Sequence, residues 1–200
     1  MFPTCTNARA SNVTKTGTLL LGFGANIPGR WGTPRETICR ALAEIESSGL
    51  TVLAASHFYL TRPVGSQHQP SFFNAVVAAE VHVAPGALLR SLKTIERRAG
   101  RRPGGHWGPR PLDIDVLDYG GRRLGWPVRR RRAGSLILPH PEVHKRAFAL
   151  VPLLEVAPHW MHAALGISGR RLLQRLSPSQ RSSFGQKLDF GGCSCENHSK

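Results

Sequence analysis

Two aspartates stand one residue apart in the segment HWGPRPLDIDVL, residues 106–117. Because alternate side chains of a strand share a face, we expect Asp113 and Asp115 to point the same way, with Leu112 and Ile114 on the other side. Two like charges on a half-buried strand cost free energy unless a cation compensates them. A hard divalent cation such as Mg²⁺ does this with one or two carboxylates plus substrate phosphates. The alternative is an edge strand whose carboxylates form salt bridges with nearby arginines.

Arginines and glycines surround this carboxylate pair. Arg101, Arg102 and Arg110 flank it, and the loop before it contains Gly100, Gly104, Gly105 and Gly108. Guanidinium groups match phosphate oxygens, and near a metal site they stabilise the charge that develops during phosphoryl transfer. The combination therefore predicts a phosphoryl-transfer site, with a surface loop of no function as the alternative.

Composition limits the class of protein. The chain has 200 residues, 40% of them hydrophobic and 20% charged, which is typical of one globular domain. No stretch approaches the roughly 20 apolar residues of a membrane span, so no membrane partner is expected. The cysteines are too few for a secreted disulfide scaffold. A formal net charge of +15 favours anionic partners, either polynucleotides or small phosphates.

Hydrophobic periodicity predicts alternating strands and helices. A helix begins after Thr33, which forms a capping box with Glu36, and it stops at Gly49. A second helix spans 85–99. Strands are expected at 18–23, 50–60, 73–83 and 112–119. The order is βαββαβ, so we predict an α+β fold with a ferredoxin-like core, in which an antiparallel sheet is packed with helices. A helical part at about 145–156, interrupted by Pro152, is expected to pack beside this core.

Three regions are expected along the chain. Residues 1–16 are predicted to be a flexible leader, 17–176 the folded domain, and 177–200 a flexible Ser/Gly-rich tail. The leader has no apolar segment of the kind found in secretory signals, so a cytoplasmic location is expected.

The motifs resemble, in order, those of the 6-hydroxymethyl-7,8-dihydropterin pyrophosphokinases of folate biosynthesis. The resemblance runs from Thr18 to Pro158 and rests on HWGPRPLDIDVL together with LGFGAN (21–26), FYLTRPVGSQHQPSFFNAVV (58–77), IERRAGR (95–101) and LILPHPEVHKRAFALVPLLEVAP (136–158). It implies Mg²⁺-dependent transfer of an intact pyrophosphoryl group from ATP to the pterin hydroxymethyl oxygen, which releases AMP.

The resemblance also implies the roles of individual residues. Asp113 and Asp115 match the metal-binding aspartates, which would hold two Mg²⁺ ions. Arg101 and Arg110 match catalytic arginines. The predicted ATP contacts are Glu96, Arg110, His140 and Arg146. The predicted pterin contacts are Thr61, Pro63, Val64, Gly65, Phe72, Asn74, Trp107 and Phe148. A flat, polar heterocycle binds well between aromatic faces with a few donors and acceptors at its edge.

Several features depart from the family pattern or leave alternatives open. Ala25 stands where a serine is common, Phe72 where a tyrosine is common, and the basic insert 125–135 is interpreted as a solvated loop. An RNA-recognition module is the rival from another class, because it has the same order of elements. An inactive interaction protein is a third possibility. The expected partners are ATP and the pterin, with no nucleic acid, and the expected state is a monomer.

Overall fold

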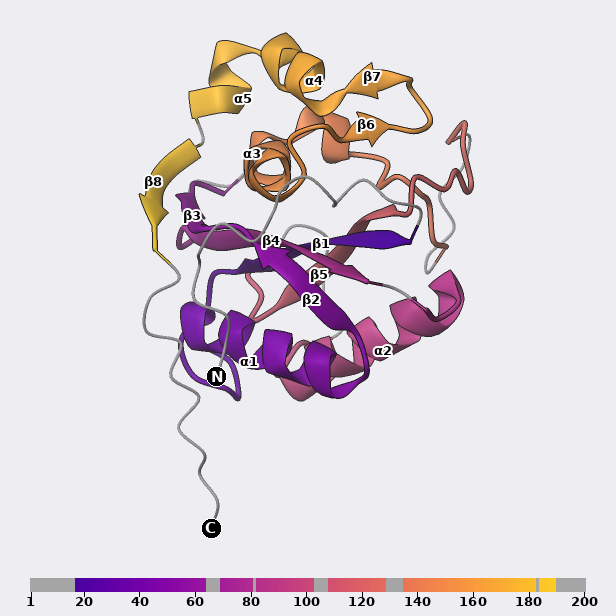
Figure 1. Ribbon diagram of the computed structural model, residues 1–200. Coiled ribbons are helices and arrows are strands. Elements are labelled where there is room, and N and C mark those ends of the chain that lie inside the picture. Colours follow the sequence, from indigo (N-terminus) through magenta and orange to yellow (C-terminus); the bar gives the residue numbers. More distant parts are fainter. Residues whose placement is uncertain are drawn as a thin grey trace.

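The structure, a computed structural model, describes residues 17–63, 69–80, 82–102, 108–128, 135–182 and 184–189. The N-terminal segment 1–16 lies outside these residues. Figure 1 shows the order of the elements along the chain, and their bounds are β1 (Thr18–Ala25), α1 (Pro34–Ser47), β2 (Thr51–Ala55), β3 (Phe58–Thr61), β4 (Phe72–Glu80), α2 (Pro85–Arg98), β5 (Asp113–Tyr119), the short 3₁₀ helix η1 (Val143–Lys145), α3 (Ala147–Val156), β6 (Met161–His162), β7 (Ile167–Ser168), α4 (Gly169–Arg175), α5 (Pro178–Ser182) and β8 (Phe184–Leu188).

A six-stranded sheet forms the centre of the molecule. Its strands run in the order β5-β1-β4-β3-β8, and β2 pairs with β4 alongside β3. Every pairing is antiparallel. With α1 and α2 as the two connecting helices, this is the predicted α+β, ferredoxin-like βαββαβ arrangement, which is confirmed.

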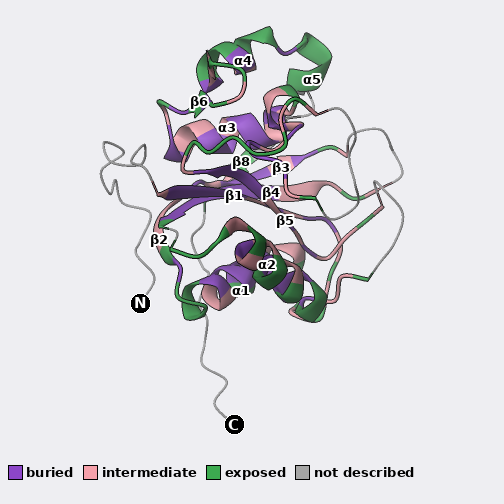
Figure 2. Cartoon of the chain, turned by 90° about the vertical axis from the view of Figure 1, so that its right-hand side faces the viewer, coloured by how far each residue is buried: buried purple, intermediate pink, exposed green. Residues whose placement is uncertain are grey.

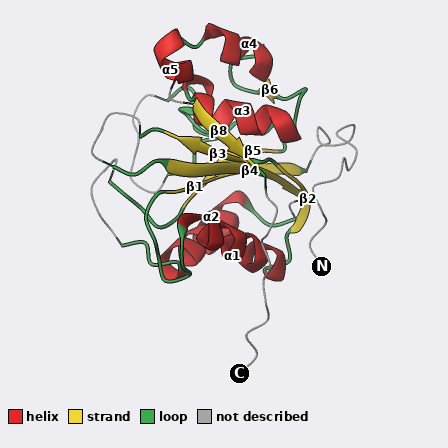
Figure 3. Cartoon of the chain, turned by 90° about the vertical axis from the view of Figure 1, so that its left-hand side faces the viewer, coloured by secondary structure: helices red, strands yellow, loops and turns green. Residues whose placement is uncertain are grey.

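Helices cover both faces of the sheet. Helices α1 and α2 lie against one face, and α3 lies against the other with α4 and α5 beyond it (Figures 2 and 3). Strand β1 shows how the sequence supplies both layers, because Leu19, Leu21 and Phe23 pack toward α1 and α2, whereas Leu20 packs with α3. Alternation along one strand therefore builds two separate cores.

Helix α1 begins as the sequence predicts. The Glu36 side chain accepts a hydrogen bond from the Thr33 backbone N–H at 2.7 Å, and the Thr33 side chain accepts one from the Glu36 N–H. The predicted inward faces of the two helices are also buried, including Ile38 and Ile45 of α1 and Leu88 and Leu92 of α2. The capping box and the periodicity thus placed α1, and the periodicity placed α2, which has no side-chain cap.

The expected single strand at 50–60 is wrong, because the structure divides it into β2 and β3. The break falls at Ser56 and His57. The Ser56 hydroxyl accepts a hydrogen bond from the Val76 N–H at 2.9 Å, so a side chain replaces the backbone acceptor at this point of the ladder. The expected interruption by Pro152 is also absent, since α3 continues through that buried residue to Val156.

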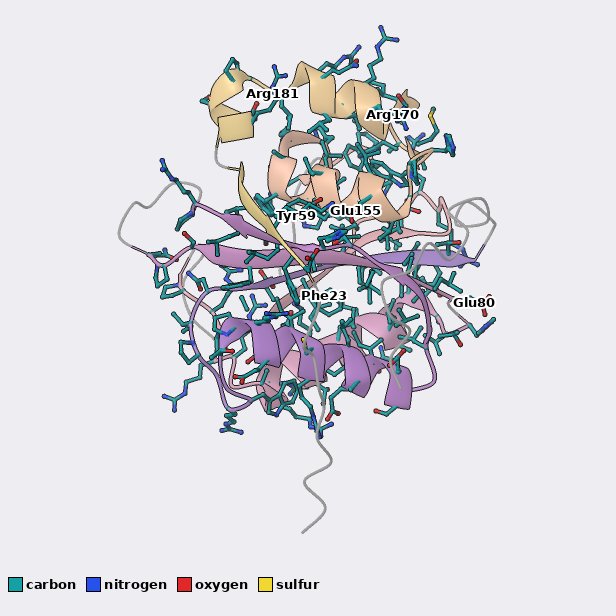
Figure 4. The ribbon with its side chains drawn as sticks, turned by 60° about the vertical axis from the view of Figure 1, so that its left-hand side comes forward. Phe23, Tyr59, Glu80, Glu155, Arg170 and Arg181 are labelled. Atoms are coloured by element: carbon teal, nitrogen blue, oxygen red, sulfur yellow. The ribbon has the colours of Figure 1, made fainter. Side chains whose placement is uncertain are left out.

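The tail also differs from its prediction at Pro178–Ser182, which forms α5, and at Phe184–Leu188, which forms β8. Strand β8 pairs with β3 and so covers an edge of the sheet. Glu155 of α3 helps to hold it there, because its carboxylate accepts a hydrogen bond from the Tyr59 hydroxyl at 2.7 Å and lies 3.8 Å from the Lys187 ammonium. Figure 4 shows Tyr59 and Glu155 side by side between the sheet and α3. The Ser/Gly-rich composition of the tail predicts flexibility, but it carries no information about these contacts with distant residues.

A buried histidine sits in the layer above α3. His162 is fully buried among Trp126, His144 and Trp160, and its Nε2 atom has no hydrogen-bond partner. Burial, followed by the neighbouring His144, lowers the pKa of His162 to about 4. The folded protein therefore holds this ring neutral, whereas the unfolded chain takes up a proton near the ordinary histidine pKa.

Stability is expected to fall as the pH is lowered through the window between these two pKa values, about 6.5 to 4. The unfolded state binds more protons in this window, so His162 contributes a loss of up to about 3 kcal/mol. Urea unfolding at pH 7 and pH 5 should show about 2 kcal/mol of this loss, because pH 5 lies inside the window. His162→Phe should flatten this pH dependence, and the exposed His82→Asn should leave it unchanged. Equal pH slopes for the wild type and His162→Phe would contradict the assignment.

No helix in the described ranges combines the length and apolar composition needed to cross a membrane.

Candidate functional site

A cavity of about 290 Å³ opens between the sheet and the segments before and within α3. It brings together most of the residues predicted from the sequence. Those that line it are Thr61, Pro63, Phe72, Asn74, Arg101, Arg110, Asp113, Asp115, His140, Arg146 and Phe148. Val64, Gly65 and Trp107 lie outside the described residues, and Glu96 does not line the cavity.

The two aspartates of β5 face the cavity together, as alternation requires. Asp113 is paired in register with Gly24 of β1, and Asp115 with Gly22. Glycine carries no side chain, so the strand next to the carboxylates leaves room above the sheet. Ile114, between them, points into the core beneath α2.

The carboxylates have unlike electrostatic environments. Burial raises the pKa of Asp113, but the guanidinium groups of Arg101 and Arg110 outweigh it, so the pKa lies below its ordinary value. Each of these arginines contacts one carboxylate oxygen of Asp113. Burial and the charge of Asp113 raise the pKa of Asp115 to about 6. The cavity therefore contains both the salt bridges and the paired carboxylates that the sequence left as alternatives.

His140 lies on the other side of Asp115. Its Nδ1 atom accepts a hydrogen bond from the Glu142 N–H at 3.1 Å, so the neutral ring carries its proton on Nε2. This Nε2 atom is 4.0 Å from the Asp115 carboxylate. The ring is thus oriented with its Nε2 atom toward the Asp115 carboxylate.

Glu96 sits behind the arginines. It is 2% exposed, and its carboxylate accepts a hydrogen bond from the Ile114 N–H at 2.8 Å and lies 2.9 Å from the Arg101 guanidinium. Its Oε1 atom is also 2.7 Å from the ammonium of Lys93, which does line the cavity. Sequence reasoning missed Lys93. Its position three residues before Glu96 on a helix was the available signal.

The other end of the cavity is suited to a flat polar ligand. The rings of Phe72 and Phe148 line it, and the Asn74 amide donates a hydrogen bond to the Thr61 hydroxyl at 2.7 Å. Thr61 thereby fixes one side of the amide. The Arg146 guanidinium lies 5.7 Å from the centre of the Phe148 ring, at the boundary between the two ends.

Asn26 joins the loops around the cavity, a role that sequence reasoning missed. Its side-chain oxygen accepts a hydrogen bond from the Arg110 N–H at 2.8 Å, and its amide nitrogen donates to Gln69 and to the Pro70 carbonyl. One amide at the end of β1 therefore links the arginine segment to the loop before β4. Asn26 is the last residue of the LGFGAN motif, but the motif alone does not predict which residues its side chain contacts.

Gly24 is expected to be essential for the shape of the end of the cavity that contains Phe72 and Asn74. A Cβ atom at this position would lie 3.2 Å from the Asn74 side-chain oxygen and 3.8 Å from the Phe72 ring. Gly24→Ala should therefore displace the Asn74 amide and raise KM for a heterocyclic substrate by about tenfold, with kcat changed less. Steady-state kinetics with varied acceptor measure this. The matched variant Gly86→Ala, in α2, should behave as wild type; an unchanged KM in Gly24→Ala would contradict the role.

The fold and the cavity together define a class of protein. One end of the cavity gathers two carboxylates with arginine, lysine and histidine donors, which suit a metal-bound polyphosphate. The other end offers aromatic faces and an oriented amide for a flat acceptor. This arrangement is that of a transferase that moves a phosphate-containing group onto a heterocycle.

Comparison with known proteins identifies the family. Residues 20–158 match the model of 7,8-dihydro-6-hydroxymethylpterin-pyrophosphokinase (HPPK), and the chain belongs to this family. A Synechocystis protein named 2-amino-4-hydroxy-6-hydroxymethyldihydropteridine pyrophosphokinase is 33% identical over 174 residues, which cover 86% of this chain and 83% of that protein.

Two longer proteins are also similar. The mitochondrial folate synthesis bifunctional protein of Arabidopsis thaliana is 34% identical over 82% of this chain, and the chain spans 31% of its length. A crystal structure of Plasmodium falciparum HPPK-DHPS shares the fold, with a TM-score of 0.60 and 16% identity over 83% of this chain and 45% of that one.

Family membership confirms the resemblance seen in the sequence. The chain is a pyrophosphokinase, a diphosphotransferase, and its function is the transfer of pyrophosphate from ATP to hydroxymethyldihydropterin in folate biosynthesis. The rival RNA-recognition module needs an open sheet face on which bases stack. Here cores lie on both faces of the sheet. The roles of the individual residues stay predictions.

Proposed function

We propose that this one cavity performs the whole reaction, with ATP phosphates at the charged end and the pterin at the aromatic end. The hydroxymethyl oxygen forms a bond to the β-phosphorus of ATP, the bond from that phosphorus to the oxygen bridging the α-phosphate breaks, and AMP leaves as the hydroxyl proton is released. The observation that carries the proposal is the single 290 Å³ cavity bordered by Asp113 and Asp115 as well as by Phe72 and Asn74.

Asp113 and Asp115 are the proposed Mg²⁺ ligands. The two carboxylates lie on one face of a strand, in a cavity that is also lined by arginines and a histidine. Carboxylate oxygens are the ligands that Mg²⁺ prefers when phosphates complete its coordination. Burial and then the charge of Asp113 raise the pKa of Asp115, and a bound cation would offset both effects. Two bound Mg²⁺ ions would neutralise phosphate charge and align the β-phosphorus.

The remaining roles follow from position in the cavity. Arg101 and Arg110 are proposed to stabilise charge on the transferred group, and His140 and Arg146 to bind the triphosphate. Phe72 and Phe148 are proposed to hold the pterin ring between them, with Thr61 and Pro63 beside it. Val64, Gly65 and Trp107 lie outside the described residues, and their proposed contact with the pterin rests on the family resemblance alone. Glu96, which is buried behind the cavity, is proposed to act on ATP only through Arg101 and Lys93, which it orients.

Product analysis tests the reaction. The purified 200-residue chain is incubated with ATP, Mg²⁺ and 6-hydroxymethyl-7,8-dihydropterin, and the nucleotides are separated. AMP that forms only in the presence of the pterin supports pyrophosphoryl transfer. ADP would indicate transfer of a single phosphate and contradict the proposal. Omission of Mg²⁺, with chelator present, should abolish AMP formation.

We also propose that the chain acts as a monomer in the cytoplasm. A domain with its own sheet and two cores does not need a second copy to bury its apolar residues. Sedimentation equilibrium of the full chain tests the first part, and a mass of twice 21.9 kDa would contradict it. Cell fractionation tests the second.

A further inference from the structure

The arginines and the proposed metal ligands compete for the same oxygens. Arg101 contacts Oδ1 of Asp113 and Arg110 contacts Oδ2, so both carboxylate oxygens already have a guanidinium partner. Asp115, in contrast, has His140 at 4.0 Å as its one ion-pair neighbour within the described ranges. A divalent cation entering the site therefore finds one carboxylate open and the other occupied.

The two arginines are not held equally. Arg101 has a second acidic partner, Glu96, at 2.9 Å, and its guanidinium also reaches the Leu112 carbonyl. Arg110 has Asp113 as its one carboxylate partner in the part of the chain that the structure describes, and its Nε donates to the Gly108 carbonyl at 3.2 Å. Breaking the contact with Asp113 leaves Arg101 paired but leaves Arg110 without an acidic partner.

Cationic groups already outnumber the carboxylates around Asp113 before any substrate binds. Glu96, Asp113 and Asp115 face Lys93, Arg101 and Arg110, and the charge of Arg146 also acts on Asp115. A metal cation arriving alone adds to this positive charge and meets Arg110 at the carboxylate it requires. A triphosphate arriving with the cation offsets the added charge, because it supplies anionic oxygens to the displaced guanidinium.

We infer that Arg110 is an exchangeable arm: it occupies Asp113 in the free enzyme and transfers to a phosphate oxygen of the metal–triphosphate when the cation takes its place. Arg101 stays tied to Glu96 throughout. The exchange restricts metal binding in the absence of nucleotide and delivers Arg110 to the phosphates only when the metal is in place. The inference rests on the proposed metal site at Asp113 and Asp115.

Binding of Mn²⁺ to the 200-residue chain without nucleotide tests the exchange, with free Mn²⁺ followed by electron paramagnetic resonance. Removing the competing guanidinium in Arg110→Gln should tighten Mn²⁺ binding by about tenfold. Arg110→Lys, which retains the charge, should stay closer to wild type. A thermal melt of each variant checks that the fold is kept.

Arg98→Gln is the matched control. It removes the same charge from an exposed residue of α2 that pairs with Glu44 at 2.6 Å and does not line the cavity. At 0.15 M salt this distant charge is screened, so Mn²⁺ binding should equal that of the wild type.

The outcomes separate the inference from the metal site on which it rests. Asp115→Asn should weaken Mn²⁺ binding in both the wild-type and the Arg110→Gln backgrounds. If it does, but Arg110→Gln binds Mn²⁺ no more tightly than Arg98→Gln, the exchange is overturned and the metal site stands. If neither the wild type nor Arg110→Gln binds Mn²⁺ at a site that Asp115→Asn removes, the metal site and the exchange both fail.

Discussion

Asp115→Asn is expected to lower kcat for AMP formation by at least about 10³-fold, because it removes the carboxylate that is open to a divalent cation. Asparagine has nearly the same shape but no charge. The variant should also fold as well as the wild type or better. In the folded protein the pKa of Asp115 is raised to about 6, so the ionised carboxylate is less favourable there than in the unfolded chain, and near pH 7 to 8 the neutral amide avoids this cost.

Two measurements on this variant separate a metal-binding role from a structural one. Pterin-dependent AMP production gives kcat, and thermal unfolding at pH 8 gives Tm. A structural role predicts a lower Tm, whereas a metal ligand predicts an unchanged or higher Tm with lost activity. Glu142→Gln, which neutralises a partly exposed carboxylate of the nearby PHPE turn, should retain activity. Turnover within tenfold of wild type in Asp115→Asn would refute the proposed metal ligand.

Arg110→Ala is expected to lower kcat by about 10² to 10³-fold while KM for ATP changes by only a few-fold. In the free enzyme the Arg110 guanidinium is paired with Asp113. Its contact with phosphate is therefore expected to form as the reaction proceeds, and to stabilise the transition state more than bound ATP. Steady-state kinetics with varied ATP at saturating pterin give both constants.

The ratio of the two effects distinguishes the roles that Arg110 could have. A loss in KM with kcat unchanged would make the arginine an anchor for bound ATP. Arg98→Ala, on the outer side of α2, supplies the control for loss of an arginine and should retain both constants. Together, the Mn²⁺ titration and these kinetics test whether Arg110 weakens metal binding before ATP binds and increases kcat afterwards.

The sequence alone determined the features that depend on local order. Alternation put Asp113 and Asp115 on one face of β5, because strand geometry has a period of two. The Thr33 and Glu36 capping box located the start of α1, and the order of the motifs indicated the family. Each of these signals is contained in a few adjacent residues or in their succession.

Only the tertiary structure decided which distant residues meet. The break at Ser56, the attachment of β8 through Glu155 and the link from Asn26 to Arg110 join residues separated by 20 to 96 positions. Burial likewise removed Glu96 from the cavity wall and raised the pKa of Asp115, whereas the arginines Arg101 and Arg110 lowered the pKa of Asp113 on the same strand. Local pattern specifies the direction of a side chain, but its partners and its electrostatic environment arise from the packing of segments far apart in the chain.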